Sequence, residues 1–156
     1  MGLAGMTHFM GTLTSRLDAK GRVSIPAQFR AGLREAGDTV DLVLRPSHKH
    51  PSIEAWPRAA FEALAKPMSL LDAFSDEEDD LAFMIYAGSV PMKPDGEGRL
   101  VLPENLVRHA GLTDQVAFVG LGKKFEIWEP AAQAARYQQA LSRGLARNLT
   151  LPARSE

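Results

Sequence analysis

The pattern of polar and apolar positions in residues 12–25 predicts two short strands joined by a tight turn. Residues 12–17 form a segment with one polar face, which is typical of a half-buried strand. Asp18 and Gly21 suit the first and fourth positions of a β-turn. Residues 22–25 then alternate charged, apolar, polar and apolar, so we expect them to be the returning strand of a hairpin.

The same pattern occurs a second time, with constant spacing from its Asp to its Pro. The two matching segments are Asp18-Ala19-Lys20-Gly21-Arg22-Val23-Ser24-Ile25-Pro26 and Asp95-Gly96-Glu97-Gly98-Arg99-Leu100-Val101-Leu102-Pro103. A match this long in register indicates an internal repeat, so the chain contains two copies of one small unit. Because a unit of this size buries little apolar surface alone, we expect the two copies to share one core.

Each copy continues with a short helix and further strands. Pro26 and Pro103 each begin a helix, since a proline costs no hydrogen bond at the first helical position. Phe29 and Leu33 are four residues apart and are expected on the buried face of the first helix. Later strands are predicted at residues 39–44, 53–56, 116–120 and 125–128, with polar helices at 58–66 and 131–143.

A run of acidic residues lies between the two copies, at residues 76–80. Ser75 with Glu78 three positions later predicts a capped helix N-terminus, where carboxylates also complement the helix dipole. A magnesium site is the alternative interpretation of these acids, and a solvated helix start is much the commoner case.

Charge is distributed unevenly along the chain, although the formal net charge is only −1 at pH 7. Basic residues outnumber acidic ones in residues 1–50, whereas residues 51–80 are strongly acidic. A basic unit beside an acidic linker is compatible with nucleic-acid binding, because binding depends on the local field. The chain has no Cys, which removes disulfides, thiol catalysis and Cys-ligated zinc. No segment resembles a signal peptide or a membrane span, so we expect a cytoplasmic protein.

The arginine that follows the Gly in both motifs is the main candidate for chemistry. A turn requires the Asp and the Gly, but it does not require an Arg at the next position. A guanidinium on a rigid turn can contact phosphate or a guanine edge in bidentate fashion. The alternative is an ion pair with the Asp that is only structural. The candidate DNA-binding residues are Arg16, Lys20, Arg22 and Arg99, and the turn-forming residues are Asp18, Gly21, Asp95 and Gly98.

The two motifs differ in charge. The first carries Arg16, Lys20 and Arg22 with one acid, whereas the second carries Lys93 and Arg99 with two acids. The first is therefore predicted to be the better polyanion binder, and the second to be nearer to a structural or subunit-contact copy.

Other classes of site find little support. No nucleophile elbow and no pair of carboxylates suited to acid–base work stands out, so no catalytic residue, enzyme activity, cofactor or metal is predicted. His48-Lys49-His50 lacks a third ligand nearby, and a surface loop is the favoured interpretation. Trp56 and Trp128 have apolar neighbours at equivalent places and are interpreted as core.

Nearly the whole chain resembles the MraZ family, the bacterial transcriptional regulators of the division and cell-wall gene cluster. The resemblance rests on Phe9-Met10-Gly11-Thr12, the paired motifs and Phe125-Glu126-Ile127-Trp128. It implies an α+β, mainly β fold, with two AbrB-like swapped-hairpin units in one pseudo-twofold β-barrel and short flanking helices. The family signature falls on Asp18 with Arg22 and on Asp95 with Arg99.

The resemblance also implies a ring-shaped homo-oligomer that binds short direct repeats in double-stranded DNA upstream of its own operon. The chain departs from the pattern at residues 1–8, which precede the usual start, and at Val107, where the first copy has Arg30.

The expected organisation follows from these observations. We predict an N-terminal extension (1–8), a first, DNA-binding unit (11–58), a helical acidic linker (59–87), a second unit (88–131) and a C-terminal helix and tail (132–156). The expected function is that of a nucleoid-associated, sequence-specific repressor. A protein-interaction module, similar to antitoxins of the same superfold, is the alternative. Binding that weakens steeply with salt would favour DNA.

Overall fold

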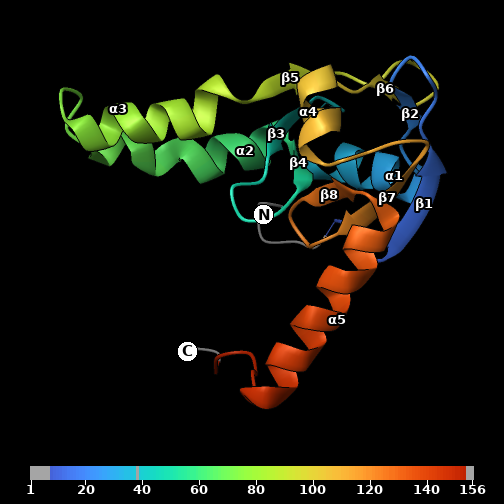
Figure 1. The fold of residues 1–156 in the computed structure, drawn as a ribbon. Coiled ribbons are helices and arrows are strands. Elements are labelled where there is room, and N and C mark those ends of the chain that lie inside the picture. Colours follow the sequence, from blue (N-terminus) through green and yellow to red (C-terminus); the bar gives the residue numbers. More distant parts are fainter. Residues whose placement is uncertain (1–7, 38, 154–156) are drawn as a thin grey trace.

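Two β-sheets of unequal size form the centre of the fold (Figure 1). The computed structural model describes residues 8–37 and 39–153. Its larger sheet has the strand order β1-β7-β8-β4-β3-β5, and its smaller sheet pairs β2 with β6. The strands are β1 (Thr12–Arg16), β2 (Arg22–Ser24), β3 (Leu42–Pro46), β4 (Ser52–Pro57), β5 (Val90–Met92), β6 (Arg99–Val101), β7 (Gln115–Gly120) and β8 (Phe125–Trp128).

Short helices surround the sheets, so the α+β, mainly β class is confirmed. The helices are α1 (Ala27–Ala36), α2 (Arg58–Ala65), α3 (Asp76–Ala82), α4 (Glu104–His109) and α5 (Pro130–Ala146), with a 3₁₀ turn η1 (Lys66–Leu70) and a π-helical turn η2 (Phe83–Ala87). Helix α1 follows Pro26 and buries Phe29 and Leu33, as the spacing predicts. Residues 1–7 of the expected extension, Asp38, and residues 154–156 of the tail lie outside the described residues.

The two copies of the repeat exchange strands. β1 of the first copy pairs with β7 of the second, and β5 of the second copy pairs with β3 of the first. The two remaining contacts join equivalent strands, β4 with β8 and β2 with β6. The strand pairing is therefore pseudo-twofold, and each copy completes the sheet of the other, as the swapped-hairpin resemblance implies.

Two expectations about the strands need correction. Residues 22–24 do not return alongside β1, because β2 leaves the turn and pairs with β6. The alternating pattern indicated a half-buried strand but contained no information about its partner. The closed barrel is also not confirmed, since β1 and β5 are the outer strands of an open sheet and no ladder among the described residues joins them.

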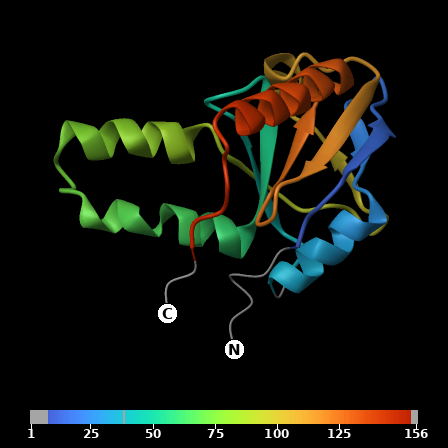
Figure 2. The same cartoon turned by 90° about the horizontal axis from the view of Figure 1, so that it is seen from below.

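One face of the large sheet carries the hydrophobic core. Its side chains pack with α1, α4 and the β2–β6 pair into a single cluster that includes both copies. Four aromatic rings lie at its centre, and the centroid of Phe125 is 5.1 Å from those of Phe9 and Phe29. Figure 2 shows α5 lying across the sheet and α1 on the opposite side. The shared core explains how two small units become one stable body.

Residues 58–87 form a helical arm that projects from the sheets (Figures 1 and 2). It runs out along α2 and η1 and returns along α3 and η2. The side chain of Ser75 accepts a hydrogen bond from the Glu78 N–H at 3.1 Å, so the predicted cap is confirmed. Phe61 and Ala65 are buried at the base of the arm, but none of residues 66–87, all of which the structure describes, is buried.

The shared core predicts a large cost for a cavity at Leu44, which is fully buried on β3. We expect Leu44→Ala to lower the free energy of unfolding by about 2–5 kcal/mol. The matched control, Leu151→Ala, changes a side chain that is 93% exposed and should alter stability by less than about 0.5 kcal/mol. Urea denaturation followed by circular dichroism measures both, and similar values for the two variants would contradict the core described here.

Candidate nucleic-acid interface

The first turn, residues 18–21, is held by a single carboxylate. Oδ1 of Asp18 accepts hydrogen bonds from the N–H groups of Lys20 and Arg22, both at 2.9 Å. Its Oδ2 accepts a bond from Nε of Arg22 at 2.8 Å. The Gly21 N–H donates to the Asp18 carbonyl oxygen at 3.0 Å, and Gly21 has a φ of +80°, which favours glycine. The Asp thus fixes both the turn and the arginine that follows it.

The second turn, residues 95–98, repeats this arrangement. Asp95 Oδ1 accepts from the N–H groups of Glu97 and Arg99 at 2.9 Å, and its Oδ2 accepts from Nε of Arg99 at 2.8 Å. Gly98 has a φ of +79°. One difference is that Nη1 of Arg99 also lies 3.6 Å from Oε2 of Glu97. The structural ion pair considered from the sequence is therefore present in both copies.

This ion pair leaves the outer edge of the Arg22 guanidinium available, whereas Nη1 of Arg99 also faces Glu97. The side chains of Arg22 and Arg99 are 49% and 47% exposed. Among the described residues, none accepts a hydrogen bond from the Nη atoms of Arg22, because its bond to Asp18 uses Nε. A guanidinium that is oriented through Nε keeps its outer edge free for a second, bidentate partner. The structural and the functional interpretations of the motif are therefore compatible.

Both aspartates have lowered pKa values. The largest cause is the backbone hydrogen bond from the arginine N–H, followed by the bond from the arginine side chain. The same pairing raises the pKa of Arg99, with the Asp95 hydrogen bond as the largest cause. In both turns the bonds to the carboxylate therefore favour the ionised form of the Asp.

The paired strands β2 and β6, here called the ribbon, bring the two arginines onto one surface. Val23 and Leu100 lie opposite each other on the buried face of the ribbon. The exposed face carries Arg22, Ser24, Arg99 and Val101. Arg22 is opposite Val101 and Arg99 is opposite Ser24, so the arginines are diagonal neighbours, about 7–8 Å apart.

The other predicted site residues surround the first turn. Arg16 ends β1, Lys20 lies within the turn, and both are exposed. The loops of the first and second turns lie at the same end of the molecule (Figure 1). Lys20 and Arg22 are thus at one end of the ribbon, while Arg16 lies on β1, next to Ser15, whose hydroxyl bonds to the Ser24 carbonyl oxygen at 3.2 Å.

Sequence reasoning missed one arginine at the second turn. Arg30 belongs to α1 of the first copy, yet its aliphatic stem packs against Gly98, so that a Cβ there would collide with Arg30 Cδ. Its Nη1 donates a long hydrogen bond, 3.5 Å, to the Glu97 carbonyl oxygen. No local signal marks this contact, because it depends on the strand exchange that brings the two copies together.

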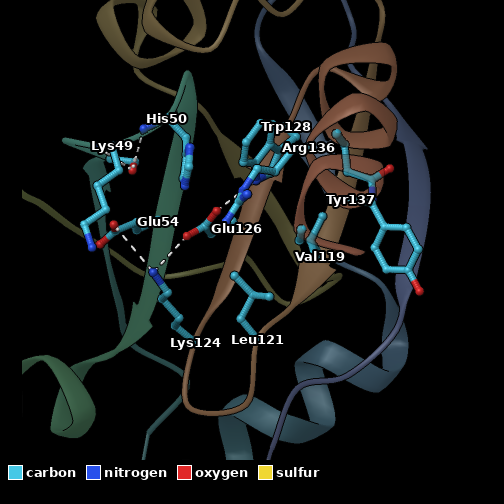
Figure 3. Close-up of a pocket in the computed structure, with 13 residues that line it drawn as sticks. Lys49, His50, Glu54, Val119, Leu121, Lys124, Glu126, Trp128, Arg136 and Tyr137 are labelled. Carbon is cyan, nitrogen blue, oxygen red and sulfur yellow. Dashed lines mark hydrogen bonds and ion pairs between the residues drawn. The ribbon is translucent and has the colours of Figure 1, made fainter. Parts of the chain in front are cut away.

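A hollow of about 310 Å³ lies on the other face of the sheet, beside α5 (Figure 3). Here the register places Glu54 opposite Glu126, a carboxylate pair that sequence reasoning did not find. Lys124 Nζ lies 2.8 Å from Oε2 of Glu126 and 3.5 Å from Oε2 of Glu54. Nε1 of Trp128 donates to Glu126 at 2.8 Å, and Nε1 of Trp56 donates to Glu54 at 2.9 Å. These bonds occupy the carboxylates, so the like charges that face each other across the two strands are partly compensated.

The remaining candidates take structural places. Trp128 is buried as expected, whereas Trp56 is only half-buried and has the Lys124 ammonium 5.3 Å from its ring centroid. His48 bonds to the Met84 carbonyl oxygen at 3.1 Å, while His50 packs on Trp128. Burial is the largest cause that lowers the pKa of His50, followed by the charge of Arg136. Among residues 8–37 and 39–153, no three His, Asp or Glu side chains are grouped as metal ligands.

The fold and the site define a class of protein: two strand-exchanged β-units whose equivalent turns present arginines on a shared ribbon. The sequence model of a family described as "MraZ protein, putative antitoxin-like" matches residues 8–84 and again residues 85–150. A protein of Gluconacetobacter diazotrophicus named transcriptional regulator MraZ is 56% identical over 95% of this chain and 94% of its own. Proteins of the same name from Gluconobacter oxydans (53% identical, 88% and 85% covered) and Xanthobacter autotrophicus (42%, 88% and 87%) also match.

The chain therefore belongs to the MraZ family, and the resemblance noted in the sequence is confirmed. The relatives are named as regulators of transcription, which is not a class of enzyme. Within the described part of the chain, every helix is too short or too polar to cross a bilayer.

The hydrogen bonds to Asp18 and Asp95 predict a dependence on pH. We expect both carboxyl pKa values to lie below 3.8, as a carbon-detected NMR titration would measure. Since the folded pKa is depressed, the stabilisation is present above the unfolded pKa and is lost as the pH falls through the folded value. Asp18→Asn keeps the Oδ1 acceptor and should remove this contribution at the first turn only. Carboxyl pKa values at or above 3.8 would show that the bonds do not form.

Proposed function

We propose that this protein is a cytoplasmic, nucleoid-associated regulator of transcription that binds double-stranded DNA through the ribbon and its two turns. The observation that carries the proposal is the presence of Arg22 and Arg99 on one exposed face of the ribbon, each oriented by an equivalent Asp. A two-stranded ribbon fits the major groove, where arginine is the commonest partner of guanine. The naming of the relatives as transcriptional regulators supports this function.

The turns would serve the two sides of the groove. Arg16 and Lys20 are exposed beside the first turn and would contact backbone phosphates there, while Arg22 and Arg99 would face base edges. The net charge of −1 does not oppose binding, because binding depends on the local field. The acidic run of α3 lies on the arm, whereas the exposed face of the ribbon carries Arg22 and Arg99.

The family description also mentions antitoxins, so a protein partner is the competing function. A partner held by apolar contacts would bind with little dependence on salt. DNA binding instead weakens with a log–log slope of about −0.9 per phosphate contacted. The exposed, charged face of the ribbon favours DNA over an apolar partner.

The helical arm supports self-association. Several large apolar side chains of the arm remain exposed to solvent in the described chain. They are Leu64 (44% exposed), Leu70 (85%), Phe74 (97%), Phe83 (68%), Met84 (47%) and Tyr86 (47%). At the base of the arm, alanines of α2 and α1 line a hollow with Trp56 and Leu64. An arm that docks on the next copy makes a head-to-tail contact, which generates a ring when the rotation closes.

A ring would explain the form of the operator. Each subunit presents one small ribbon, and repeating it in a ring raises avidity by about 10²–10⁴ when the DNA sites are spaced to match. The proposed target is a set of short direct repeats upstream of the protein's own division and cell-wall operon, which it would repress. A nuclease footprint on that DNA tests the target directly.

Arg22 should be the more sensitive of the two ribbon arginines, because Glu97 competes for Arg99. We expect Arg22→Ala to weaken operator binding by about 1–3 kcal/mol per contacted site, or about 5- to 150-fold, and Arg99→Ala to weaken it less. Fluorescence anisotropy at several salt concentrations measures both effects. Arg143→Ala removes the same charge from α5 and serves as the control. Full binding by both ribbon variants would leave the arginines with a purely structural role.

Disrupting the apolar arm should disrupt assembly. We expect the native protein to exceed its 17.0 kDa monomer mass in light scattering, and Phe83→Glu to reduce that mass while the circular dichroism spectrum is retained. Leu151→Glu places the same charge on another exposed leucine and should leave the mass unchanged. A native protein that stays monomeric at micromolar concentration would rule out the ring.

A further inference from the structure

We propose that a hollow between α1 and the second turn is a separate binding site for a backbone phosphate of duplex DNA. The site, here called the α1 hollow, has a volume of about 270 Å³ and is lined by Arg30, Arg34, Lys93 and the second turn. It rests on the proposed DNA-binding function and adds to it a contact made by residues outside the repeated motif.

Arg30 forms the inner wall of the α1 hollow. It is half-buried, its stem covers Gly98, and its Nε is buried without a hydrogen-bond partner among the described residues. Its single hydrogen bond there is the 3.5 Å contact from Nη1 to a backbone carbonyl. A guanidinium held this way has lost solvent at one nitrogen and gained little in return, so an anion beside it would be favourable.

Arg34 and Lys93 form the outer wall. Arg34 lies one helical turn beyond Arg30, on the same side of α1, and Lys93 lies just before the second turn. Both side chains are exposed. Neither makes an ion pair with a residue that the structure describes, whereas nearby Arg99 pairs with two carboxylates. Their charges are therefore directed to solvent at the opening of the hollow.

The carboxylates near the α1 hollow are already engaged. Asp95 lines it, but both of its oxygens accept hydrogen bonds from the second turn and from Arg99. Glu97 lies 3.6 Å from Arg99. Three cations thus share a small concave surface with one carboxylate whose charge is largely compensated. This excess of positive charge favours an anion as the ligand.

The position of the hollow selects a DNA phosphate over a free anion. It adjoins the second turn, at the opposite end of the ribbon from the first turn and its Lys20. A ribbon lying in the major groove has a phosphate strand on each side. The basic residues of the first turn would meet one strand, and the α1 hollow would meet the other.

The second copy of the repeat provides an internal comparison. Val107 occupies in α4 the place that Arg30 has in α1, and Gly111, just beyond the end of α4, corresponds to Arg34. The helix of the second copy therefore supplies no arginine at these two positions, and the basic residues near the first turn are its own Lys20 and Arg16. Two of the three cations beside the acidic second turn, Arg30 and Arg34, come from the first copy. They offset the lower positive charge that the sequence of the second motif shows.

The test compares the salt dependence of DNA binding between variants. In the full-length protein, Arg34→Ala with Lys93→Ala should reduce the log–log slope by about one unit per bound subunit, since about 0.9 is expected for each phosphate lost. Arg143→Ala with Arg147→Ala removes the same charge from the end of α5 and should leave the slope unchanged. A slope equal to that of the native protein in the Arg34 and Lys93 variant would overturn the proposal.

Arg30 requires a separate pair of variants, because it also packs on the second turn. Arg30→Val introduces the residue found at the equivalent position, Val107, and should lower the salt slope of DNA binding. Arg30→Lys keeps the charge and should retain most of the native slope. If both variants reduce DNA affinity equally and leave the salt slope unchanged, Arg30 is a packing residue only. Its proposed contact with the phosphate is then wrong.

Two further outcomes separate this proposal from the general function. If the native protein and the α1-hollow variants bind operator DNA with the same steep dependence of log affinity on log salt, only the hollow is refuted. If the native protein shows no salt dependence at all, DNA binding itself is refuted. Inorganic phosphate, tested at constant ionic strength, distinguishes the source of the anion. Phosphate could raise the melting temperature of the native protein but not that of the Arg34 and Lys93 variant, while both bind DNA with the same salt dependence. That result would assign the hollow to a free anion and overturn the DNA contact.

Discussion

The exchange of edge strands between the two copies is the constraint on which the rest of the structure depends. β1 has its ladder partner in β7 and β5 has its partner in β3, so neither copy contains a complete sheet. The core is shared in the same way, with Phe9 and Phe29 of the first copy packed on Phe125 of the second. Neither unit would therefore retain its fold if the other were removed, and all surface features depend on their union.

The ribbon follows directly from this exchange. Each of its strands comes from a different copy, and only their pairing turns two isolated arginines into diagonal neighbours on one face. The same exchange carries Arg30 across to the second turn, where its stem lies against Gly98, whose φ of +79° favours glycine. A surface suited to a long, regular polyanion is thus assembled from residues far apart in the chain, and Asp18 and Asp95 hold its arginines in matching orientations.

Local features were predictable from the sequence, and non-local ones were not. The turns at Asp18 and Asp95, the helix after Pro26 and the Ser75 cap depend on neighbouring residues, and all are present. The partner of β2 and the contact of Arg30 with Gly98 depend on distant residues, which an alternating pattern does not encode. Glu54 and Glu126 were overlooked for the same reason, because they face each other only through the register of β4 with β8.

That pair of glutamates also bears on why the two halves of the chain differ. They face each other where the two copies meet, and like charges directly opposite across strands are destabilising. Lys124 of the second copy lies within ion-pair distance of both and compensates part of their charge, whereas the residue of the first copy that reaches Glu126 is the uncharged Ser52. A first unit that paired with another first unit would oppose two carboxylates without any lysine. Compared with the mixed pairing, this single ammonium group therefore disfavours an assembly in which the first units of two nascent chains pair with each other.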